Sequence, residues 1–215
     1  MKIFLDTGDV DAIRRANATG LVDGVTTNPS HIARTGRPFK EVVKEICDIV
    51  SGPISAEVMA EDAAGMVTEA VEIAGIAPNV AVKIPMTVEG MKAVPILEEE
   101  KSIATNVTMI FSSTQAFLAM KAGATFVSIV LSRLDAVGNE SDILVADAVQ
   151  IRDNYGYTSE IIAGSMKTQN HVLSCLRSGI DIVTINPDLF FQMFKHPLTD
   201  SGLADFAKDW EKVPK

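Results

Sequence analysis

The stretch Val-Ala-Val-Lys-Ile-Pro at residues 80–85 is short, apolar, rich in β-branched residues and closed by a proline. These features predict a buried strand that ends at Pro85. A lysine inside such a strand is costly unless its charge is paired or removed. Burial favours the neutral amine, which is the form in which lysine acts as a nucleophile. Lys83 is therefore a candidate nucleophile, and an ion pair with a carboxylate on a neighbouring strand is the alternative.

Similar strand-like runs recur along the whole chain, and amphipathic stretches separate them. The strand-like runs are Ile3–Asp6, Gly24–Thr27, Ile54–Val58, Val80–Ile84, Ser102–Asn106, Phe126–Val130, Glu160–Ala163 and Ile182–Ile185. The helical stretches are Val10–Ala18, Phe39–Val50, Ala63–Ala74, Glu89–Glu99, Thr114–Lys121, Asp142–Arg152, Gln169–Arg177 and Leu189–Lys195, with a final helix at Leu203–Trp210. The apolar residues of 39–50 recur every three or four positions, as on one face of a helix.

Alternating strands and helices predict a parallel sheet covered on both faces. Eight such units within 215 residues favour an α/β fold of the closed (β/α)8 TIM-barrel type with short helices. An open, doubly wound sheet is the alternative, but it calls for a glycine-rich turn after the first strand, and Asp6–Asp9 lacks one. No linker interrupts the sequence, so we expect residues 1–215 to form one catalytic barrel domain with an additional C-terminal helix at about 199–212.

Composition limits the classes of partner. Hydrophobic residues make up 47% of the chain and the net charge is −9, so nucleic acids and anionic membranes are unfavourable partners. The apolar part of the N-terminus is too short for a signal peptide, and no run approaches the length of a membrane span. Cys47 and Cys175 lie in helical patterns and are expected to be reduced thiols. A cytoplasmic location is therefore expected.

Motifs for other chemistries are missing from the sequence. It contains no phosphate-binding loop of the Walker type, no His-Glu-x-x-His and no Cys-x-x-Cys. His31, His171 and His196 are predicted on a loop, on a helix and at a helix end, which does not suggest a metal site or a catalytic triad. The residues thus indicate no cofactor and no metal.

In a TIM barrel, chemistry collects at the carboxyl ends of the strands. The candidates at those ends are Asp6, Thr26–Pro29, Glu57, Lys83, Asn106, Thr108, Ser128, Arg133, Ser165 and Lys167. Two carboxylates that converge on a lysine from strands 1, 3 and 4 form the most specific part of this set. The alternatives are that Asp6 caps the first helix, although Asp9 is better placed for that, and that Glu57 only forms a salt bridge with Lys83.

A candidate anion site lies farther along the chain. Gly164–Lys167 precedes a helix, where free N–H groups and the helix dipole favour anions. Arg133 adds a planar guanidinium suited to phosphate. The alternatives are a simple helix cap at Ser165 and a structural pair between Arg133 and Asp135.

Six motifs carry a resemblance to a known family. They are Phe-Leu-Asp-Thr at 4–7, Gly-Val-Thr-Thr-Asn-Pro-Ser at 24–30, Val-Lys-Ile-Pro-Met-Thr at 82–87, Thr-Asn-Val-Thr at 105–108, Ala-Gly-Ala-Thr at 122–125 and His-Pro-Leu-Thr-Asp at 196–200. With these motifs, spread over essentially the whole chain, the sequence resembles the small transaldolases, a group that includes the fructose-6-phosphate aldolases.

The resemblance implies a class I aldolase-type barrel that acts through a Schiff base at Lys83, with no cofactor. It implies Asp6 as the acid and base, and Glu57 with Thr108 as the pair that positions the catalytic water. The further roles implied are sugar binding by Thr26, Asn28, Asn106 and Ser128, and phosphate binding by Arg133, Ser165 and Lys167. Glu57 and Asn106 resemble the transaldolase version, which favours transfer of a dihydroxyacetone unit from fructose 6-phosphate or sedoheptulose 7-phosphate to an aldose phosphate over release by water.

Four positions depart from the family pattern. Ile129-Val130 stands where the family usually has a proline and an aromatic residue, Lys167 where many transaldolases have arginine, and Ser132 where glycine or asparagine is usual. These changes keep two alternatives open: a fructose-6-phosphate aldolase, and a transaldolase for a sulfonated sugar such as sulfofructose. A non-catalytic barrel, the alternative from another class, is not favoured, because the lysine, both carboxylates and the anion site occur together.

The resemblance also implies a homo-oligomer, a pentamer or a decamer, in which the C-terminal helix reaches a neighbouring subunit. Leu203, Phe206 and Trp210 give that helix an apolar stripe suited to docking. Packing of the stripe on its own barrel is the alternative.

Overall fold

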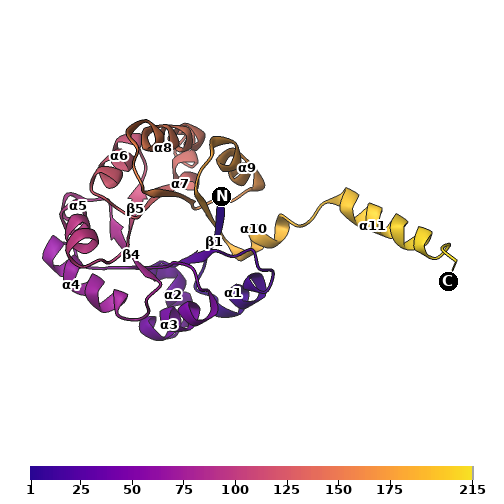
Figure 1. Cartoon of the computed structure of the whole chain (residues 1–215), viewed down its shortest axis with the longest axis horizontal. Helices are drawn as coiled ribbons and strands as arrows, with labels where there is room; N and C mark the ends of the chain where they lie inside the picture. The colour runs from indigo at the N-terminus through magenta and orange to yellow at the C-terminus, as the bar shows by residue number, and fades with distance from the viewer. Residues whose placement is uncertain (215) are drawn as a thin grey trace.

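The structure is a computed structural model in which residues 1–214 are described. Eight parallel strands close into a barrel in sequence order, with β8 paired to β1. The strands are β1 (Lys2–Asp6), β2 (Gly24–Thr26), β3 (Ile54–Glu57), β4 (Val80–Pro85), β5 (Thr105–Ile110), β6 (Phe126–Val130), β7 (Glu160–Gly164) and β8 (Ile182–Ile185). Figure 1 looks into the ring of strands, with helices around its outside. The predicted (β/α)8 barrel is confirmed.

Helices follow every strand. They are α1 (Val10–Asn17), α2 (Pro29–Thr35), α3 (Phe39–Ile49), α4 (Ala63–Ala74), α5 (Val88–Pro95), the π-helical turn η1 (Ile96–Glu100), α6 (Ser113–Lys121), α7 (Leu131–Asp135), α8 (Ser141–Tyr155), α9 (Gln169–Ser178), α10 (Pro187–Gln192) and α11 (Pro197–Trp210). Asp9 caps α1 by accepting a hydrogen bond from the Ala12 amide, as its position in the sequence suggested.

Two helices, α2 and α7, were not predicted. Asn28 caps α2, Pro29 occupies its first turn, and Gly36 ends it in the left-handed conformation. His31 therefore lies on a helix and not on a loop. The five residues of α7 follow β6 directly and carry Ser132 and Arg133. Both helices are too short to show a clear apolar period, and both begin where the carboxyl end of a strand turns outward.

The fifth strand was predicted at Ser102–Asn106 but runs from Thr105 to Ile110. Ser102 adopts φ +54°, and the pairing of β5 with β4 begins only at Thr105, so Ser102 belongs to the loop after η1. The strand then continues past Asn106 because Val107 and Ile110 are both fully buried. The final helix begins at Pro197, well before the predicted Leu203, because Pro197 suits its first turn and His196 caps it. Other differences in element bounds are smaller: α8 continues to Tyr155, past the predicted Arg152, and α10 ends at Gln192, before the predicted Lys195.

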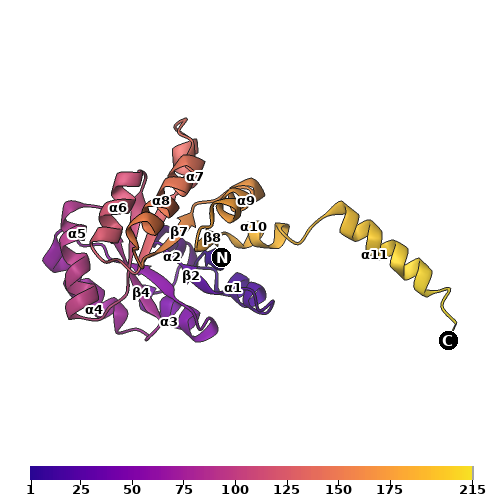
Figure 2. The same ribbon diagram turned by 45° about the horizontal axis from the view of Figure 1, so that its top comes forward.

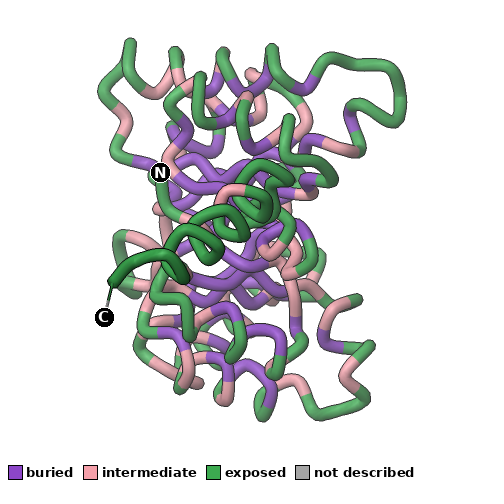
Figure 3. Tube along the Cα trace, turned by 90° about the vertical axis from the view of Figure 1, so that its right-hand side faces the viewer, coloured by how far each residue is buried: buried purple, intermediate pink, exposed green. Residues whose placement is uncertain are grey.

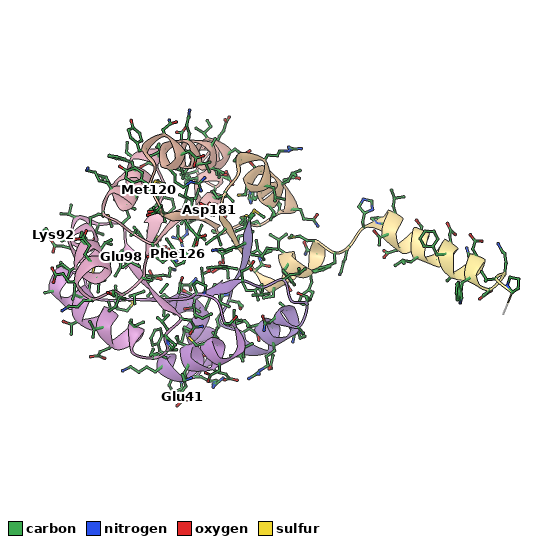
Figure 4. The ribbon with its side chains drawn as sticks, in the orientation of Figure 1. Glu41, Lys92, Glu98, Met120, Phe126 and Asp181 are labelled. Atoms are coloured by element: carbon green, nitrogen blue, oxygen red, sulfur yellow. The ribbon has the colours of Figure 1, made fainter. Side chains whose placement is uncertain are left out.

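Alternation along the strands separates two apolar regions. Residues that point outward pack against the helices and form the large core. Inside the barrel lies a small apolar layer of Phe4, Ala81, Phe126, Ile162 and Ile182. The rings of Phe4 and Phe126 meet edge to face with centroids 6.4 Å apart, and Figure 4 labels Phe126. A Cβ atom on Gly24 would lie 2.6 Å from the Phe4 ring, so this position needs glycine. The layer closes the amino-terminal end of the barrel.

The C-terminal helix stands apart from this body. Figures 1 and 2 show α11 projecting away from the barrel beyond α10, and Figure 3 shows it exposed along its length. None of its residues is buried, and Leu203, Phe206 and Trp210 are 61%, 73% and 74% exposed. The stripe thus does not pack on its own barrel. Among residues 1–214, no helix combines the length and the apolar character needed to cross a bilayer.

Candidate active site

Polar side chains form the next layer of the barrel interior, above the apolar one. The buried polar residues here are Thr26, Ser55, Lys83, Asn106, Thr108, Ser128 and Thr184. Side chains alternate along a strand with a period of two, so residues two positions apart point to the same side. Lys83, Ser128 and Thr184 therefore point into the barrel, each two positions after a residue of the apolar layer. The polar layer faces the carboxyl ends of the strands, where barrel enzymes carry their chemistry.

Lys83 lies in the middle of this layer. It is 8% exposed, and its Nζ donates hydrogen bonds to Glu57 Oε2 and to the carbonyl oxygen of Thr27, both at 3.1 Å. Glu57 and Lys83 are direct neighbours across β3 and β4, and Asn106 is the next in the row on β5. The expected contact between lysine and carboxylate is therefore present, and Glu57 is close enough to take a proton from the amine.

The second carboxylate, Asp6, ends β1. Its Oδ1 accepts a hydrogen bond from Thr26 Oγ1 at 3.0 Å. The hydroxyls of Thr26 and Thr184 are 2.7 Å apart. A hydroxyl has one hydrogen to donate, and Thr26 gives its hydrogen to Asp6, so Thr184 is the donor in the second contact. The chain of two threonines fixes one oxygen of the carboxylate. Asp6 does not cap a helix.

Asn106 is fully buried and held at both ends of its amide. Its Oδ1 accepts from Ser128 Oγ at 2.6 Å, and its Nδ2 donates to Ser55 Oγ at 2.9 Å. Within residues 1–214, the amide keeps one N–H without a partner, and Asn106 lies beside Lys83 in the neighbouring strand. Thr108 lies two residues farther along the same face and is 6% exposed. The structure thus brings Asn106 and Ser128 together, as the sequence led us to expect.

A second cluster lies at the rim. Ser165 adopts φ +59° directly after β7, and its hydroxyl is 2.8 Å from that of Ser132 on α7. Thr168, and not Ser165, caps α9, so the alternative that Ser165 only caps a helix is wrong. Met109 also has a left-handed φ, +63°, where the pairing of β5 with β6 shifts register. Strained residues and bulges of this kind gather at functional sites.

The cationic groups of this rim, Arg133 and Lys167, are both exposed. Arg133 contacts the sulfur of Met109 at 3.8 Å and makes no ion pair within residues 1–214, so the predicted alternative of a pair with Asp135 is not present. Asp135 instead lies 3.2 Å from His171 Nε2, and His171 Nδ1 accepts from the Lys167 amide at 3.2 Å. The imidazole thereby links α7 to the loop that carries Lys167.

Sequence reasoning missed four side chains that orient this site. Ser55 holds Asn106, Thr184 holds Thr26, His171 links the two arms of the rim, and His31 lies beside Asp6. The position of Ser55, two residues before Glu57 on the same strand, could have revealed it, since both must face inward. The other three depend on contacts between distant elements.

Comparison with known proteins shows the family of the chain. The family model described as transaldolase/fructose-6-phosphate aldolase matches residues 3–215. The chain belongs to this family. It is 54% identical to a probable transaldolase of Geobacter metallireducens over 100% of both chains. It is 56% identical to a probable transaldolase of Methanococcus maripaludis over 98% of both.

The chain is accordingly a transaldolase-type enzyme, and the resemblance noted in the sequence is confirmed. A more distant likeness concerns the fold alone. The crystal structure of orotidine 5'-monophosphate decarboxylase from Methanocaldococcus jannaschii superposes with a TM-score of 0.58 at 14% identity, over 86% of this chain and 87% of that chain. At this identity only the barrel is shared.

Proposed function

We propose that this transaldolase-family enzyme moves a dihydroxyacetone unit from a ketose phosphate, fructose 6-phosphate or sedoheptulose 7-phosphate, to an aldose phosphate through a Schiff base at Lys83. One observation carries the proposal: a lysine only 8% exposed, bonded to Glu57, at the centre of a polar layer inside the barrel. The polar layer around it offers a second carboxylate, amides and hydroxyls of the kind that a sugar requires.

The first half of the proposed reaction breaks a carbon–carbon bond. Lys83 first gives a proton to Glu57, whose Oε2 is 3.1 Å from Nζ. The neutral Nζ then bonds to the C2 carbonyl carbon of the ketose, and the carbonyl oxygen leaves as water. The resulting iminium accepts electrons. Asp6 removes the proton of the C4 hydroxyl, the C3–C4 bond breaks, and its electron pair moves into the iminium to give an enamine. An aldose phosphate leaves.

The second half reverses these steps on another aldehyde. The enamine carbon bonds to the carbonyl carbon of the acceptor, Asp6 returns its proton to the new alkoxide, and water releases the product from Lys83. We propose that Glu57 and Thr108 position this water. The hydroxyls of the bound three-carbon unit are assigned to hydrogen bonds with Thr26, Asn28, Asn106 and Ser128. The N–H of the Asn106 amide that has no partner within residues 1–214 supports this assignment, because Asn106 lies beside Lys83.

Borohydride trapping tests the proposal. The enzyme is incubated with fructose 6-phosphate and sodium borohydride, and its peptides are then mapped by mass spectrometry. A reduced dihydroxyacetone adduct on Lys83 is the expected result. An adduct on another residue, or none with a folded protein and either sugar phosphate, contradicts the proposal. Measuring free dihydroxyacetone with and without an acceptor aldehyde separates transfer from aldolase-type release.

The phosphate of the substrate is assigned to Arg133, Ser165 and Lys167. The hydroxyls of Ser165 and Ser132, 2.8 Å apart, join the loop after β7 to α7, so the three groups share one rim. The planar fork of Arg133 suits an oxyanion with several acceptor oxygens. A sulfonated sugar is the second candidate, because Ser132 and Lys167 change the donors at this rim from those of the family pattern.

Substitution of Arg133 by glutamine should raise KM more than it lowers kcat. The guanidinium lies at the rim and not beside Lys83, and losing a charged hydrogen bond costs about 1.5–3 kcal/mol, or roughly 10- to 100-fold in affinity. Initial rates with fructose 6-phosphate and with unphosphorylated fructose measure this. The KM for fructose should stay unchanged, and an equal rise for both sugars would contradict the assignment. Competition between inorganic phosphate and sulfate on the native enzyme compares the two anion classes.

The exposed stripe on α11 is assigned to a neighbouring subunit of a homo-oligomer, a pentamer or a decamer by family resemblance. A helix with Phe206 and Trp210 more than 70% exposed needs a partner surface in water. Replacing both residues by glutamate should lower the molar mass measured by light scattering toward that of one chain, 23.0 kDa. Lys208→Glu, on the opposite side of the same helix, is the matched control. An unchanged mass in the double variant refutes docking through the stripe.

The proposed setting is the cytoplasm, in sugar-phosphate metabolism of the pentose phosphate type. Cys47 and Cys175 are unpaired, as expected in a reducing compartment. Burial raises the pKa of the Cys47 thiol to about 11 and that of Cys175 to about 12, so both thiols stay protonated. Neither thiol takes part in the proposed reaction.

A further inference from the structure

His31 lies beside the proposed base, although the sequence gave no reason to connect the two residues. Its side chain is 16% exposed, and its Nδ1 lies 3.7 Å from Asp6 Oδ1. This nitrogen is buried and has no hydrogen-bond partner within residues 1–214. A buried polar atom of this kind normally has a partner, and the structure places the Asp6 carboxylate beside it.

The hydrogen-bond network determines which nitrogen carries the hydrogen. Asn28 Oδ1 accepts from the backbone N–H of His31 at 2.9 Å, as the cap of α2. The oxygen of that amide is therefore fixed, and the atom 3.4 Å from His31 Nε2 is the amide nitrogen. An amide nitrogen only donates, so Nε2 accepts and the neutral imidazole carries its hydrogen on Nδ1. This hydrogen is available to Asp6.

Thr26 and His31 approach the same oxygen of Asp6, and only Thr26 is within hydrogen-bond distance of it. Thr26 Oγ1 donates to Oδ1 at 3.0 Å, and the Nδ1 of His31 lies next to that atom as well. We propose that His31 is a positioning residue of Asp6: its Nδ1–H, 3.7 Å from Oδ1, attracts that oxygen electrostatically while Thr26 donates a hydrogen bond to it, which leaves Oδ2 free to take the proton of the substrate hydroxyl. This inference rests on the role proposed above for Asp6.

Several charges surround the imidazole and give this arrangement a pH dependence. Burial has the largest effect and lowers the pKa of His31 from 6.5; Asp6 on β1 opposes it, while Arg34 on α2, Lys83 on β4 and Lys167 after β7 act with it. His31 is thus neutral at pH 7 and above. Below its lowered pKa the imidazolium pairs with Asp6, which stabilises the carboxylate and makes it a weaker base. The rate of bond cleavage therefore falls on the acid side of pH 6.5.

Two variants of the full-length enzyme separate these effects. Asparagine at position 31 has an N–H donor near the place of Nδ1 but does not titrate. Leucine at this position has no donor and does not titrate. His31→Leu should lower kcat for fructose 6-phosphate about tenfold or more at pH 8 with KM unchanged, since a general base contributes roughly 10²–10⁴-fold when well oriented. His31→Asn should keep kcat within about twofold at pH 8. Its kcat should fall less steeply at acid pH than that of the unaltered enzyme, since the titration of His31 is gone. His196→Asn, which keeps the cap of α11, is the matched control.

Borohydride trapping on the same proteins distinguishes the two proposals. An adduct on Lys83 in His31→Leu, together with slow cleavage, supports the role of His31. An adduct with an unchanged kcat and an unchanged pH profile refutes it and leaves the proposed function standing. No adduct in the unaltered enzyme refutes the proposed function and, with it, this inference. If His31→Leu does not fold, His31→Asn decides: a pH profile identical to that of the unaltered enzyme overturns the proposal.

Discussion

Substitution of Lys83 by arginine is expected to lower kcat by about 10⁴-fold or more and to leave the barrel folded. Arginine keeps the positive charge beside Glu57, whose Oε2 lies 3.1 Å from the Lys83 amine. Its guanidinium does not deprotonate in proteins and forms no Schiff base. The variant therefore separates the two meanings of a buried lysine, the nucleophile and the partner of an ion pair. Steady-state transfer rates and the melting temperature measure the outcome.

Lys83→Met is the matched comparison, because it keeps the length of the side chain and removes the charge. It should be equally inactive but less stable, since Glu57 is then a mostly buried carboxylate without its partner. The double variant with Glu57→Gln should recover stability and not activity. Activity in Lys83→Arg within about tenfold of the unaltered enzyme would show that the lysine only pairs with Glu57.

The largest effect on stability is expected at Glu98, at the opposite end of the barrel. Glu98 Oε1 accepts hydrogen bonds from the backbone N–H and the hydroxyl of Thr105, at 2.7 and 2.6 Å, and from the same two groups of Thr125, at 2.8 and 2.9 Å. One carboxylate thus joins the beginnings of β5 and β6, and Figure 4 labels it. Glu98→Ala leaves four donors without this partner and should destabilise the fold by about 3–5 kcal/mol.

Thermal unfolding measures this effect. For a chain of this length the loss corresponds to a decrease in Tm of roughly 10 °C. Glu100→Ala, on the exposed side of the same turn, is the control and should change Tm by no more than about 2 °C. Equal melting temperatures for the two variants would contradict the role of Glu98. The site lies at the other end of the strands, so residual activity at low temperature should persist in Glu98→Ala.

The sequence predicted most of the barrel because its patterns are local. Short apolar runs in the strands and a period of three to four in the helices identified each of the eight repeating units, and the apolar run around Lys83 predicted that this lysine is buried. The fifth strand was predicted too early, because the polar-to-apolar change near Ser102 resembles a strand start. The pairing with β4, which begins at Thr105, and the contacts of Thr105 with Glu98 place the beginning of the strand at residue 105.

The candidate site was predicted in part. The sequence predicted that Glu57 and Lys83 would meet because both lie at the carboxyl ends of adjacent strands, and the pairing of β3 with β4 then places them side by side. The sequence left open whether Ser165 caps a helix and whether Arg133 pairs with Asp135. In the structure Thr168 caps α9, and Asp135 lies beside His171, so both alternatives are wrong. Their contact with phosphate stays a prediction, and so do the oligomer and the exact donor sugar.

By itself, the sequence determined the fold, the family and the inward position of the lysine and its carboxylates, since each depends on residues that are neighbours along the chain. The tertiary structure alone decided which polar groups orient them: Thr184 behind Thr26, Ser55 under Asn106, His31 beside Asp6 and His171 between the two arms of the rim. It also decided that α11 leaves its own barrel. The physical reason is that closure of the barrel fixes how far each strand is shifted against the next, and this shift, which no local pattern encodes, selects the contacts between distant side chains.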